Sequence, residues 1–510
     1  MEKYIVTLDS GTTSVRTLII NKHGDVVSVA QQEISQIYPR SGWVEHDPLE
    51  IWNSQRQTMQ SAKHKAKIKS VDVAAVGITN QRETILIWDK LTGLPVYNAL
   101  VWQDTRTHDF CEALIKKGHQ KMIQEKTGLL INPYFSGTKL KWILENVEGV
   151  GKKLAKKELL AGTIDTWLIW KLTNGKVHAT DVSNASRTLL FNIHTMKWDD
   201  EILELLNIPK EILPEVKASN GDFGIVDPLH WSNNAHGKVP IRSAIGDQQS
   251  ALFGQLSFNK GDVKNTYGTG AFMLLNTGEK AINSKNRLLT TVAWQLEKEK
   301  AIYALEGSVF VAGASLKWLR DSLRLIYASD ESDYYANRVQ DDGQRVYVVP
   351  AFTGLGAPYW DSSAKGAIFG LERSTNREHL VKATLESIAY QSNDLLKAME
   401  SDLKEKIKVM KVDGGVSNSK FLLQFQADIS NLEVIKPKNI ETTAMGAAYL
   451  AGLAVKFWTN LAEIEKISKI DTNSKSKITE DKRKFLLKGW NEAVKRTLNW
   501  SKDIEEVKNE

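Results

Sequence analysis

A carboxylate followed by glycine and hydroxyl side chains stands between two strand-like segments near the beginning of the sequence. Residues 4–20 read YIVTLDSGTTSVRTLII, with Asp9 directly before the SGTTS turn. Backbone N–H groups in a tight glycine turn, together with neighbouring hydroxyls, form a concave cluster of donors for phosphate. Asp9 is placed to hold Mg²⁺ directly or through water. A polar hairpin that binds nothing is the alternative interpretation of this segment alone.

A similar turn occurs about half a chain later, in NTYGTGAF at residues 265–272. The order of strand, glycine and threonine turn, and strand is repeated there, which indicates two similar units. Two donor loops on opposed units can hold the two ends of one polyphosphate. The sequence contains no P-loop motif, so these two hairpins are the predicted phosphate-binding elements.

Asp247 is the candidate for the group that accepts a proton. It stands in SAIGDQQSALF, after an apolar strand-like run and before an apparent helix. A carboxylate at this place can accept the proton of a substrate hydroxyl, and phosphoryl transfer requires a group that orients the nucleophile. Taken alone, Asp247 is also consistent with a helix N-cap.

Other loops at strand ends suit small polar ligands. Arg82 and Glu83 in ITNQRET combine a five-donor fork with an acceptor pair, which suits adjacent hydroxyl groups. Trp102 in ALVWQDTR offers a flat face to a carbon chain. The glycine turn DGGVSNS at 413–419 lets a ligand approach the backbone at a helix start. A surface ion pair, a core tryptophan and a plain turn are the respective alternatives.

The elements that must position these residues alternate between strands and helices. Apolar strand, polar loop and helix recur at 159–172 and 239–256, which is typical of α/β layering. In HDPLEIW, Asp47 at the cap position predicts the start of a helix. A capping box formed by Thr375 and Glu378 predicts the start of another, which extends to about residue 400.

The composition is that of an ordinary globular protein. The chain has 510 residues, 42% hydrophobic and 25% charged, and its length predicts two domains. The net charge of +6 is spread along the chain, so no nucleic-acid partner is expected. Cys111, the single cysteine, excludes an internal disulfide and indicates a reducing compartment. Without a signal peptide or an apolar run of about 20 residues, we expect a cytoplasmic protein with no stable membrane insertion. A homodimer or homotetramer is expected.

Eight stretches of the sequence together carry a resemblance to a known family. They are GWVEHDP, GITNQRET, YFSGTKLKWILEN, GTIDTWLIWKL, SNASRTL, GDQQSALFGQ, NTYGTGAF and ETTAMGAAYLAGLAVKFW. From Asp9 to about Trp458 the chain resembles the glycerol branch of the FGGY family of sugar and polyol kinases. YFSGTKLKWILEN and GAIFGLERSTNREHLVKATLE are similar to the two general signatures of that family, and Arg-Glu after ITNQ is specific to the glycerol branch.

The resemblance implies an α/β fold of two actin-like (ribonuclease H-like) domains that face each other across a cleft for nucleotide and substrate. It implies an N-terminal domain over 1–253 for glycerol and phosphate, and a C-terminal domain over 254–455 for nucleotide. A helical region over 456–510 would pack on the second domain. The implied reaction is ATP-dependent phosphorylation of glycerol to sn-glycerol 3-phosphate, with ATP and Mg²⁺ as cofactors.

The resemblance also implies roles for individual residues. Asp247 would act as the general base, and Asp9 would be the carboxylate associated with magnesium. The residues implied to bind glycerol are Arg82, Glu83, Trp102, Tyr134, Asp247 and Gln248. The residues implied on the nucleotide side are Thr12, Thr13, Ser14, Arg16, Thr269, Gly313, Lys317, Gly415 and Ser419.

Three residues depart from the pattern of the family, all on the expected nucleotide side. Ser10 stands where glutamine is usual, Lys317 replaces a common glutamine, and Ser419 replaces a common asparagine. We therefore predict an ATP affinity that differs from that of typical members. His230 occupies a place comparable to a histidine that the sugar phosphotransferase system phosphorylates in some members. A plain surface histidine is the alternative.

Two other functions are compatible with the same fold. One is phosphorylation of a different polyol or sugar, but the Arg82–Glu83 pair and Trp102 argue against it. The other is non-catalytic nucleotide binding, because a fold alone does not determine function. The presence of both Asp9 and Asp247 argues against this second alternative, since a binding protein needs neither a metal ligand nor a base.

Overall fold

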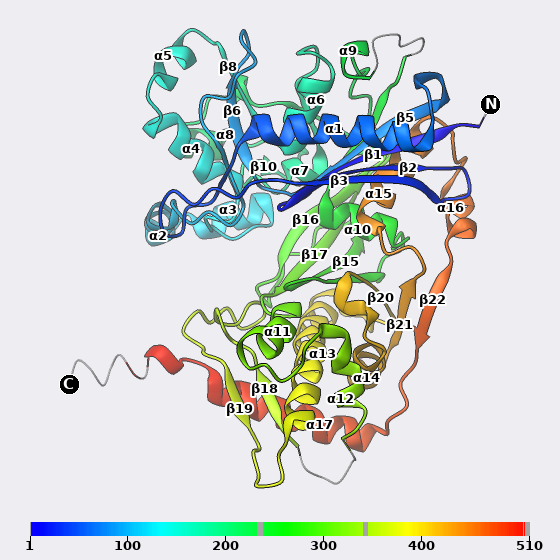
Figure 1. Ribbon diagram of the computed structural model, residues 1–510. Helices are drawn as coiled ribbons and strands as arrows, with labels where there is room; N and C mark the ends of the chain where they lie inside the picture. The colour runs from blue at the N-terminus through cyan, green and yellow to red at the C-terminus, as the bar shows by residue number, and fades with distance from the viewer. Residues whose placement is uncertain (1, 232–237, 340–344, 503, 505–510) are drawn as a thin grey trace.

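Two β-sheets, one in each half of the molecule, organise the structure (Figure 1). The computed structural model describes residues 2–231, 238–339, 345–502 and 504. The first sheet has five strands in the order β13-β5-β1-β2-β3. They are β1 (Tyr4–Ser10), β2 (Ser14–Ile20), β3 (Val26–Glu33), β5 (Val73–Asn80) and β13 (Ile241–Gly246). β2 is antiparallel to β1 and β3, whereas β5 is parallel to β1 and β13.

The second sheet repeats this plan and extends it at both edges. Its seven strands have the order β16-β17-β15-β14-β20-β21-β22. They are β14 (Val263–Tyr267), β15 (Ala271–Gly278), β16 (Leu289–Gln295), β17 (Ala301–Val309), β20 (Val409–Asp413), β21 (Glu433–Pro437) and β22 (Ile470–Ser474). β15 is antiparallel to β14 and β17, whereas β20 is parallel to β14 and β21. The prediction of two similar units is therefore confirmed.

Helices cover the outer faces of both sheets, and two helices lie between the sheets. The outer helices are α1 (Pro48–Ala66) and α6 (Ile164–Leu172) on the first sheet, and α13 (Arg377–Leu403) and α14 (Lys420–Ser430) on the second. Val6 and Leu8 of β1 face α1, whereas Ile5 packs with the inner helices α10 (Asp247–Gly254) and α15 (Thr442–Ala454). Since both faces of the strand are covered, apolar residues in β1 do not alternate with polar ones but include the neighbours Ile5 and Val6.

The two inner helices cross with their backbones in contact. A Cβ atom added to Gly254 of α10 would lie 1.9 Å from Thr442 O, and one added to Gly446 of α15 would lie 1.9 Å from Ser250 O. No side chain fits at either position at that separation. Glycine at these two positions therefore allows the close packing of α10 on α15, and through it the packing of the two halves.

Smaller elements surround this framework. A four-stranded sheet in the first half has the order β4-β7-β6-β8. Its strands are β4 (Glu45–His46), β6 (Ile85–Asp89), β7 (Ala99–Leu100) and β8 (Leu159–Thr163), and α4 (Ser136–Asn146) packs beside β6. Near the C-terminus, α16 (Leu461–Ile467) precedes β22, and α17 (Glu480–Thr497) packs against α14. In the part of the chain that the structure describes, no helix combines the length and the apolar character that crossing a membrane requires.

One predicted helix start is confirmed and one is wrong. Asp47 caps α1, and its Oδ1 accepts a hydrogen bond from Leu49 N–H at 2.8 Å. The capping box predicted at Thr375 does not form, because α13 is capped by Asn376 instead. The hydroxyl of Thr375 already accepts a hydrogen bond from Glu372 N–H in the preceding turn. The C-terminal region also contains the strand β22, which the sequence did not predict.

Candidate active site

Asp247 and the Arg82–Glu83 pair meet at one edge of the first sheet. β5 and β13 are parallel neighbours, and Asn80 pairs with Gly246 at their carboxyl ends. The chain reaches Arg82 two residues after β5, and Asp247 begins α10 directly after β13. Arg82 Nε lies 3.2 Å from Asp247 Oδ1. Polar groups gather here because the carboxyl ends of parallel strands lie side by side.

Glu306 of β17 connects this edge to the second half of the molecule. Its Oε2 accepts a hydrogen bond from Arg82 Nη1 at 2.5 Å, and its Oε1 accepts one from Arg82 Nη2 at 3.0 Å. Arg187 donates to the same Oε1 at 3.0 Å and to Glu83 Oε1 at 2.6 Å. None of these four side chains is more than 3% exposed. Two arginines and two glutamates thus form a buried network of balanced charge.

The carboxylates of this region differ in pKa. Burial raises the pKa of Asp247 to about 6, against the opposing effect of Arg82, even though 29% of the side chain is exposed. Burial would also raise the pKa of Glu306, but Arg187 and Arg82 outweigh it and lower this pKa to about 2. Glu306 is therefore a permanent anion that holds two arginines, whereas Asp247 can exchange a proton.

Trp102 and Tyr134 form an aromatic wall beside Arg82. Their ring centroids are 5.6 Å apart with the rings edge to face, and Arg82 Nη2 donates to the Tyr134 hydroxyl at 3.4 Å. The buried Lys139 donates to the backbone carbonyls of Trp102 and Tyr134 at 3.2 and 3.1 Å. Trp102 Nε1 donates to Thr12 Oγ1 at 2.9 Å. The wall therefore contacts the first hairpin loop directly.

The first hairpin loop, residues 11–13, follows the buried Asp9. Arg16, on the other strand of the hairpin, donates from Nε and Nη2 to Asp9 Oδ2 at 3.1 and 2.5 Å. Arg16 Nη1 donates to Glu441 Oε2 at 2.5 Å. Because Glu441 directly precedes α15, Arg16 ties the first loop to an inner helix.

The second hairpin loop, residues 268–270, is held by α11 (Gly313–Lys317). Gly268 N–H donates to Gly270 O at 2.8 Å and closes the turn. Thr269 O accepts a hydrogen bond from Ala314 N–H at 3.0 Å. Backbone contacts, rather than side chains, thus determine the shape of this loop.

Asp9 and Asp413 are the carboxylates that fit a magnesium ion bound with phosphate. Both contacts from Arg16 to Asp9 end on Oδ2, so this pair leaves Oδ1 available. Asp413 Oδ2 accepts hydrogen bonds from Gln255 and Thr442, but its buried Oδ1 has no partner. Mg²⁺ typically takes one or two carboxylates and fills its remaining positions with phosphate oxygens and water. The described residues contain no group of three or more His, Cys, Asp or Glu side chains that could hold a metal ion by themselves.

Other residues predicted on the nucleotide side lie on separate elements. Gly415 has open space beside it, because an added Cβ would meet nothing within 4 Å. Ser419 caps α14 by accepting from Leu422 N–H at 3.0 Å, and its hydroxyl donates to Asp333. Lys317 is exposed at the end of α11.

Comparison with known proteins decides the family. Residues 4–254 match the model of the N-terminal domain of the FGGY family of carbohydrate kinases, and residues 263–455 match that of its C-terminal domain. The chain belongs to this family. The resemblance seen in the motifs is therefore confirmed.

This FGGY-family kinase has relatives of high identity over nearly its full length. It is 68% identical over 504 residues to the glycerol kinase of Mycoplasmopsis pulmonis (strain UAB CTIP), covering 99% of each chain. It is 54% identical over 509 residues to the glycerol kinase of Haemophilus influenzae, again covering 99% of each. The crystal structure of Plasmodium falciparum glycerol kinase with ADP matches it with a TM-score of 0.92 and 38% identity, covering 98% of both chains. A gluconate kinase from Lactobacillus acidophilus shares the fold, with a TM-score of 0.86 and 21% identity over 97% of this chain and 98% of that one. The predicted two-domain α/β fold is confirmed.

The predicted glycerol-side residues of this FGGY-family kinase lie in one network of contacts. Its members are Arg82, Glu83, Trp102, Tyr134, Asp247 and Gln248, of which Gln248 accepts a hydrogen bond from Lys264. Sequence reasoning missed three charged members, Arg187, Lys264 and Glu306. A lone glutamate inside the apolar strand AIYALEGSV was the available signal for Glu306, because a charge in a buried strand needs a partner.

His230 lies on the short helix α9 (Pro228–Trp231), apart from this network. Its ring packs edge to face against Trp52, with the two ring centroids 4.9 Å apart. Its Nδ1 is buried without a hydrogen-bond partner. Burial lowers the pKa of His230. Residues 232–237, which follow in the same sequence stretch, lie outside the described residues.

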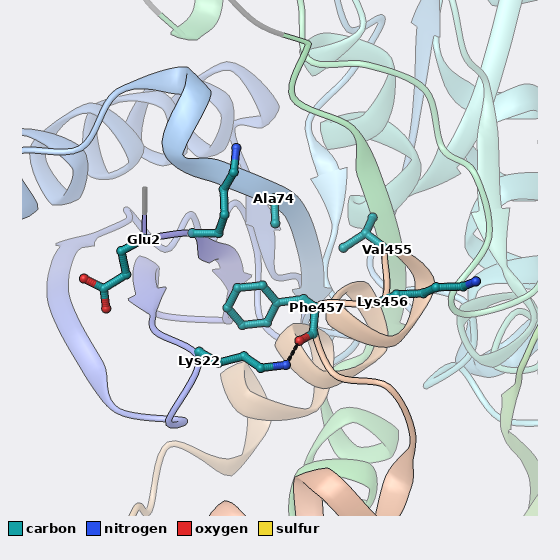
Figure 2. Close-up of a pocket in the computed structure, with 7 residues that line it drawn as sticks. Glu2, Lys22, Ala74, Val455, Lys456 and Phe457 are labelled. Carbon is teal, nitrogen blue, oxygen red and sulfur yellow. Dashed lines mark hydrogen bonds between the residues drawn. The ribbon is translucent and has the colours of Figure 1, made fainter.

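A surface hollow of about 580 Å³ lies at the opposite end of β1 from Asp9 (Figure 2). It is lined by Glu2, Lys3, Lys22, Ala74, Val455, Lys456 and Phe457. Two of its lysines already have protein partners: Lys22 pairs with Glu463 at 2.7 Å and Lys3 donates to Val71 O at 2.5 Å. The hollow shares no residue with the network around Arg82.

Proposed function

We propose that this chain transfers the terminal phosphoryl group of ATP to glycerol and forms sn-glycerol 3-phosphate. Relatives named glycerol kinase, 53–68% identical over nearly the whole chain, support this assignment. The observation that carries it in this chain is the Arg82–Glu83 pair, held by Glu306 and Arg187 directly beside Asp247.

Asp247 is the proposed general base. Its carboxylate accepts the proton of a terminal glycerol hydroxyl while the oxygen attacks the terminal phosphorus of ATP. The new oxygen–phosphorus bond forms as the bond to the bridging oxygen breaks, and ADP leaves with that electron pair. A pKa of about 6 keeps Asp247 ionised at neutral pH, and a base is most effective when its pKa lies near the working pH.

Arg82, Glu83, Tyr134 and Gln248 are proposed to orient the hydroxyl groups of glycerol. Arginine donates hydrogen bonds and glutamate accepts them. Two adjacent hydroxyl groups of glycerol can therefore bond to both side chains when the molecule lies in one particular orientation. Trp102 is proposed to cover the carbon chain. These side chains are already held by protein contacts, which lowers the entropy cost of binding.

The two hairpin loops are proposed to hold Mg·ATP. The residues assigned to the nucleotide are Thr12, Thr13, Ser14, Arg16, Thr269, Gly313, Lys317, Gly415 and Ser419. Asp9 would hold the magnesium ion, and Asp413 Oδ1, which is buried without a partner, is a second candidate ligand. When bound, the ion neutralises charge on the phosphates.

Further proposals concern the organisation of the protein. We divide it into domains over 1–253 and 254–455 and a C-terminal region over 456–510. We propose that it works in the cytoplasm as a homodimer or homotetramer. Phosphorylation by the phosphotransferase system is proposed at His230, and it would require that the packing of the ring against Trp52 opens.

A panel of acceptors tests the proposed reaction. Purified protein is given Mg·ATP with glycerol, dihydroxyacetone, xylulose, ribulose or gluconate, and ADP release is measured. We expect the highest kcat/KM with glycerol, and a dehydrogenase specific for sn-glycerol 3-phosphate should detect the product. A higher kcat/KM with another acceptor would show that the roles of Arg82, Glu83 and Trp102 are misassigned. No turnover with any acceptor would favour a non-catalytic nucleotide-binding protein.

A further inference from the structure

Lys264 of β14 is a fully buried cation for which the reaction described above has no role. Its side chain has 0% exposure. Its Nζ donates to Gln248 Oε1 at 2.5 Å and to Thr266 Oγ1 at 2.9 Å. Both partners are neutral, and an ammonium group carries three donors. The two bonds therefore leave one N–H for another acceptor.

A buried ammonium with neutral partners is costly, because burial disfavours its charged form. Two other lysines of the chain contact backbone carbonyls instead of side chains. Lys139 donates to two backbone carbonyls, and Lys411 donates to Leu256 O at 2.6 Å. Lys264 differs because both its partners are side chains, and one of them, Gln248, adjoins Asp247.

Three carboxylates act on the charge of Lys264. Asp413 at the end of β20, Asp247 at the start of α10 and Glu306 on β17 all raise its pKa, whereas burial and Arg82 lower it. β14 itself leads directly into the second hairpin loop at 268–270. The ammonium is thus bonded to Gln248, which adjoins the proposed base, and to Thr266, two residues before the proposed phosphate-binding loop.

We propose that Lys264 is a catalytic residue that donates its free N–H to the phosphoryl group during transfer from ATP to glycerol. This inference rests on the proposed function. The moving group carries negative charge on its three equatorial oxygens, and a fixed cation in a water-poor site stabilises such charge without reorganising. No proton or electron pair moves to or from Lys264, so the atoms of the reaction balance as before.

The first test is Lys264→Met, which keeps the length of the side chain and removes its charge. The matched control is Lys411→Met, because Lys411 lies directly across from Lys264 in the parallel register of β14 and β20. We expect Lys264→Met to lower kcat about 100- to 1000-fold, the usual effect of losing one such donor. The KM for glycerol should change far less, and Lys411→Met should retain kcat.

Binding measurements separate a phosphate contact from a merely structural role. Calorimetry compares ADP with a non-hydrolysable ATP analogue, each with Mg²⁺, on the same proteins. Lys264→Met should bind the analogue at least about tenfold more weakly, since it loses a hydrogen bond to a charged group. Its affinity for ADP should be unchanged. This comparison requires no acceptor, so it also tests Lys264 if glycerol is not the substrate.

The pH dependence gives a third measurement. Burial lowers the pKa of Lys264 to about 8, so kcat/KM should fall as pH rises through about 8 and the ammonium loses its proton. Lys264→Arg should remove this alkaline limb, because a guanidinium stays protonated. The charged groups that act on the pKa of Lys264 are Asp413, Asp247, Glu306 and Arg82.

Three outcomes would overturn the proposal. One is that the wild-type protein is active and the Lys264→Met variant has nearly the same kcat. Another is an equal loss of affinity for ADP and for the analogue, which indicates a structural role. The third is an alkaline limb that Lys264→Arg does not move. If the wild-type protein does not phosphorylate glycerol but the analogue test succeeds, the proposed acceptor is wrong and the assignment of Lys264 stands.

Discussion

Arg82 and Lys317 are both cations assigned to substrates, but their surroundings are opposite. Arg82 is buried and bonded to Glu306, Tyr134 and Asp247. Lys317 is exposed at the end of α11. The glycerol side is therefore held by buried charges before any substrate arrives. The proposed nucleotide side includes the backbone of two hairpin loops, and its side chain Lys317 is exposed.

This difference explains where the sequence departs from its family. Ser10, Lys317 and Ser419 are all assigned to the proposed nucleotide side. A backbone donor is present whatever the side chain, so substitution of an exposed residue such as Lys317 costs little. A change at Arg82 or Glu306 would leave a buried charge unpaired, which is strongly destabilising. The buried network around Arg82 should thus tolerate substitution poorly, whereas the exposed Lys317 should tolerate it well.

The largest expected effect is that of Asp247→Asn. The amide cannot accept the hydroxyl proton, and losing a general base typically lowers the rate about 100- to 10,000-fold. Steady-state kinetics measure kcat, with Asp222→Asn as a control because that carboxylate is 67% exposed. Near-wild-type kcat in Asp247→Asn would refute the assignment of the base.

Glu306→Gln tests the buried network. The two arginines would lose half of their balancing charge, so we expect a loss of about 3 kcal/mol in the free energy of unfolding, the scale for breaking a buried ion pair. The KM for glycerol should rise as Arg82 loses its position. Glu297→Gln is the matched control, since Glu297 is exposed and contacts Arg242 at 3.5 Å, and exposed pairs contribute about 0–1 kcal/mol. Equal losses in the free energy of unfolding for Glu306→Gln and Glu297→Gln, measured by urea unfolding, would show that the buried network contributes no more than an exposed ion pair.

The pH dependence of kcat/KM should show an acid limb from Asp247. Burial raises its pKa to about 6, so the active carboxylate is present above this pH and is lost as pH falls through it. One unit below the pKa, kcat/KM should be about tenfold lower than on the plateau. A profile that stays flat to pH 5 would show that Asp247 titrates like an ordinary aspartate.

The smallest expected effects are on the nucleotide side. Lys317→Gln and Ser419→Asn restore the usual residues of the family. The apparent KM for ATP should change about two- to fivefold. For Lys317 the reason is that an exposed charge contributes about 1 kcal/mol at most. The KM for glycerol should not change, which provides the internal control. An unchanged KM for ATP in both variants would refute the prediction that these residues alter the affinity for ATP.

Local patterns in the sequence predict the framework of the fold. The two glycine hairpins, the helix capped by Asp47 and the repeated units all follow from turn chemistry and periodicity. The capping box at Thr375 was wrong because Asn376 stands next to it, and asparagine is the better cap. When two neighbouring residues could both cap a helix, the turn before the helix determines which of them does so.

Long-range pairing is what the sequence could not predict. Arg82 and Glu306 bond across 224 residues of chain, and no local pattern indicates which charge meets which. Lys264 was overlooked because it stands beside the more conspicuous glycine turn at 268–270. The predicted residues Arg82, Glu83 and Asp247 do lie in one network, whereas no motif indicated the charges that hold it, Arg187, Lys264 and Glu306.

The glycine contact between α10 and α15 has a mechanical consequence for the chemistry. Gly254 ends the same short helix that Asp247 begins, so the contact and the base lie at opposite ends of one rigid arm about 10 Å long. A rotation of about 10° at the contact would move the base by about 2 Å, and a misplacement of about 1 Å can cost about 100-fold in rate. The position of the proposed base therefore depends on the helix contact that Gly254 and Gly446 allow.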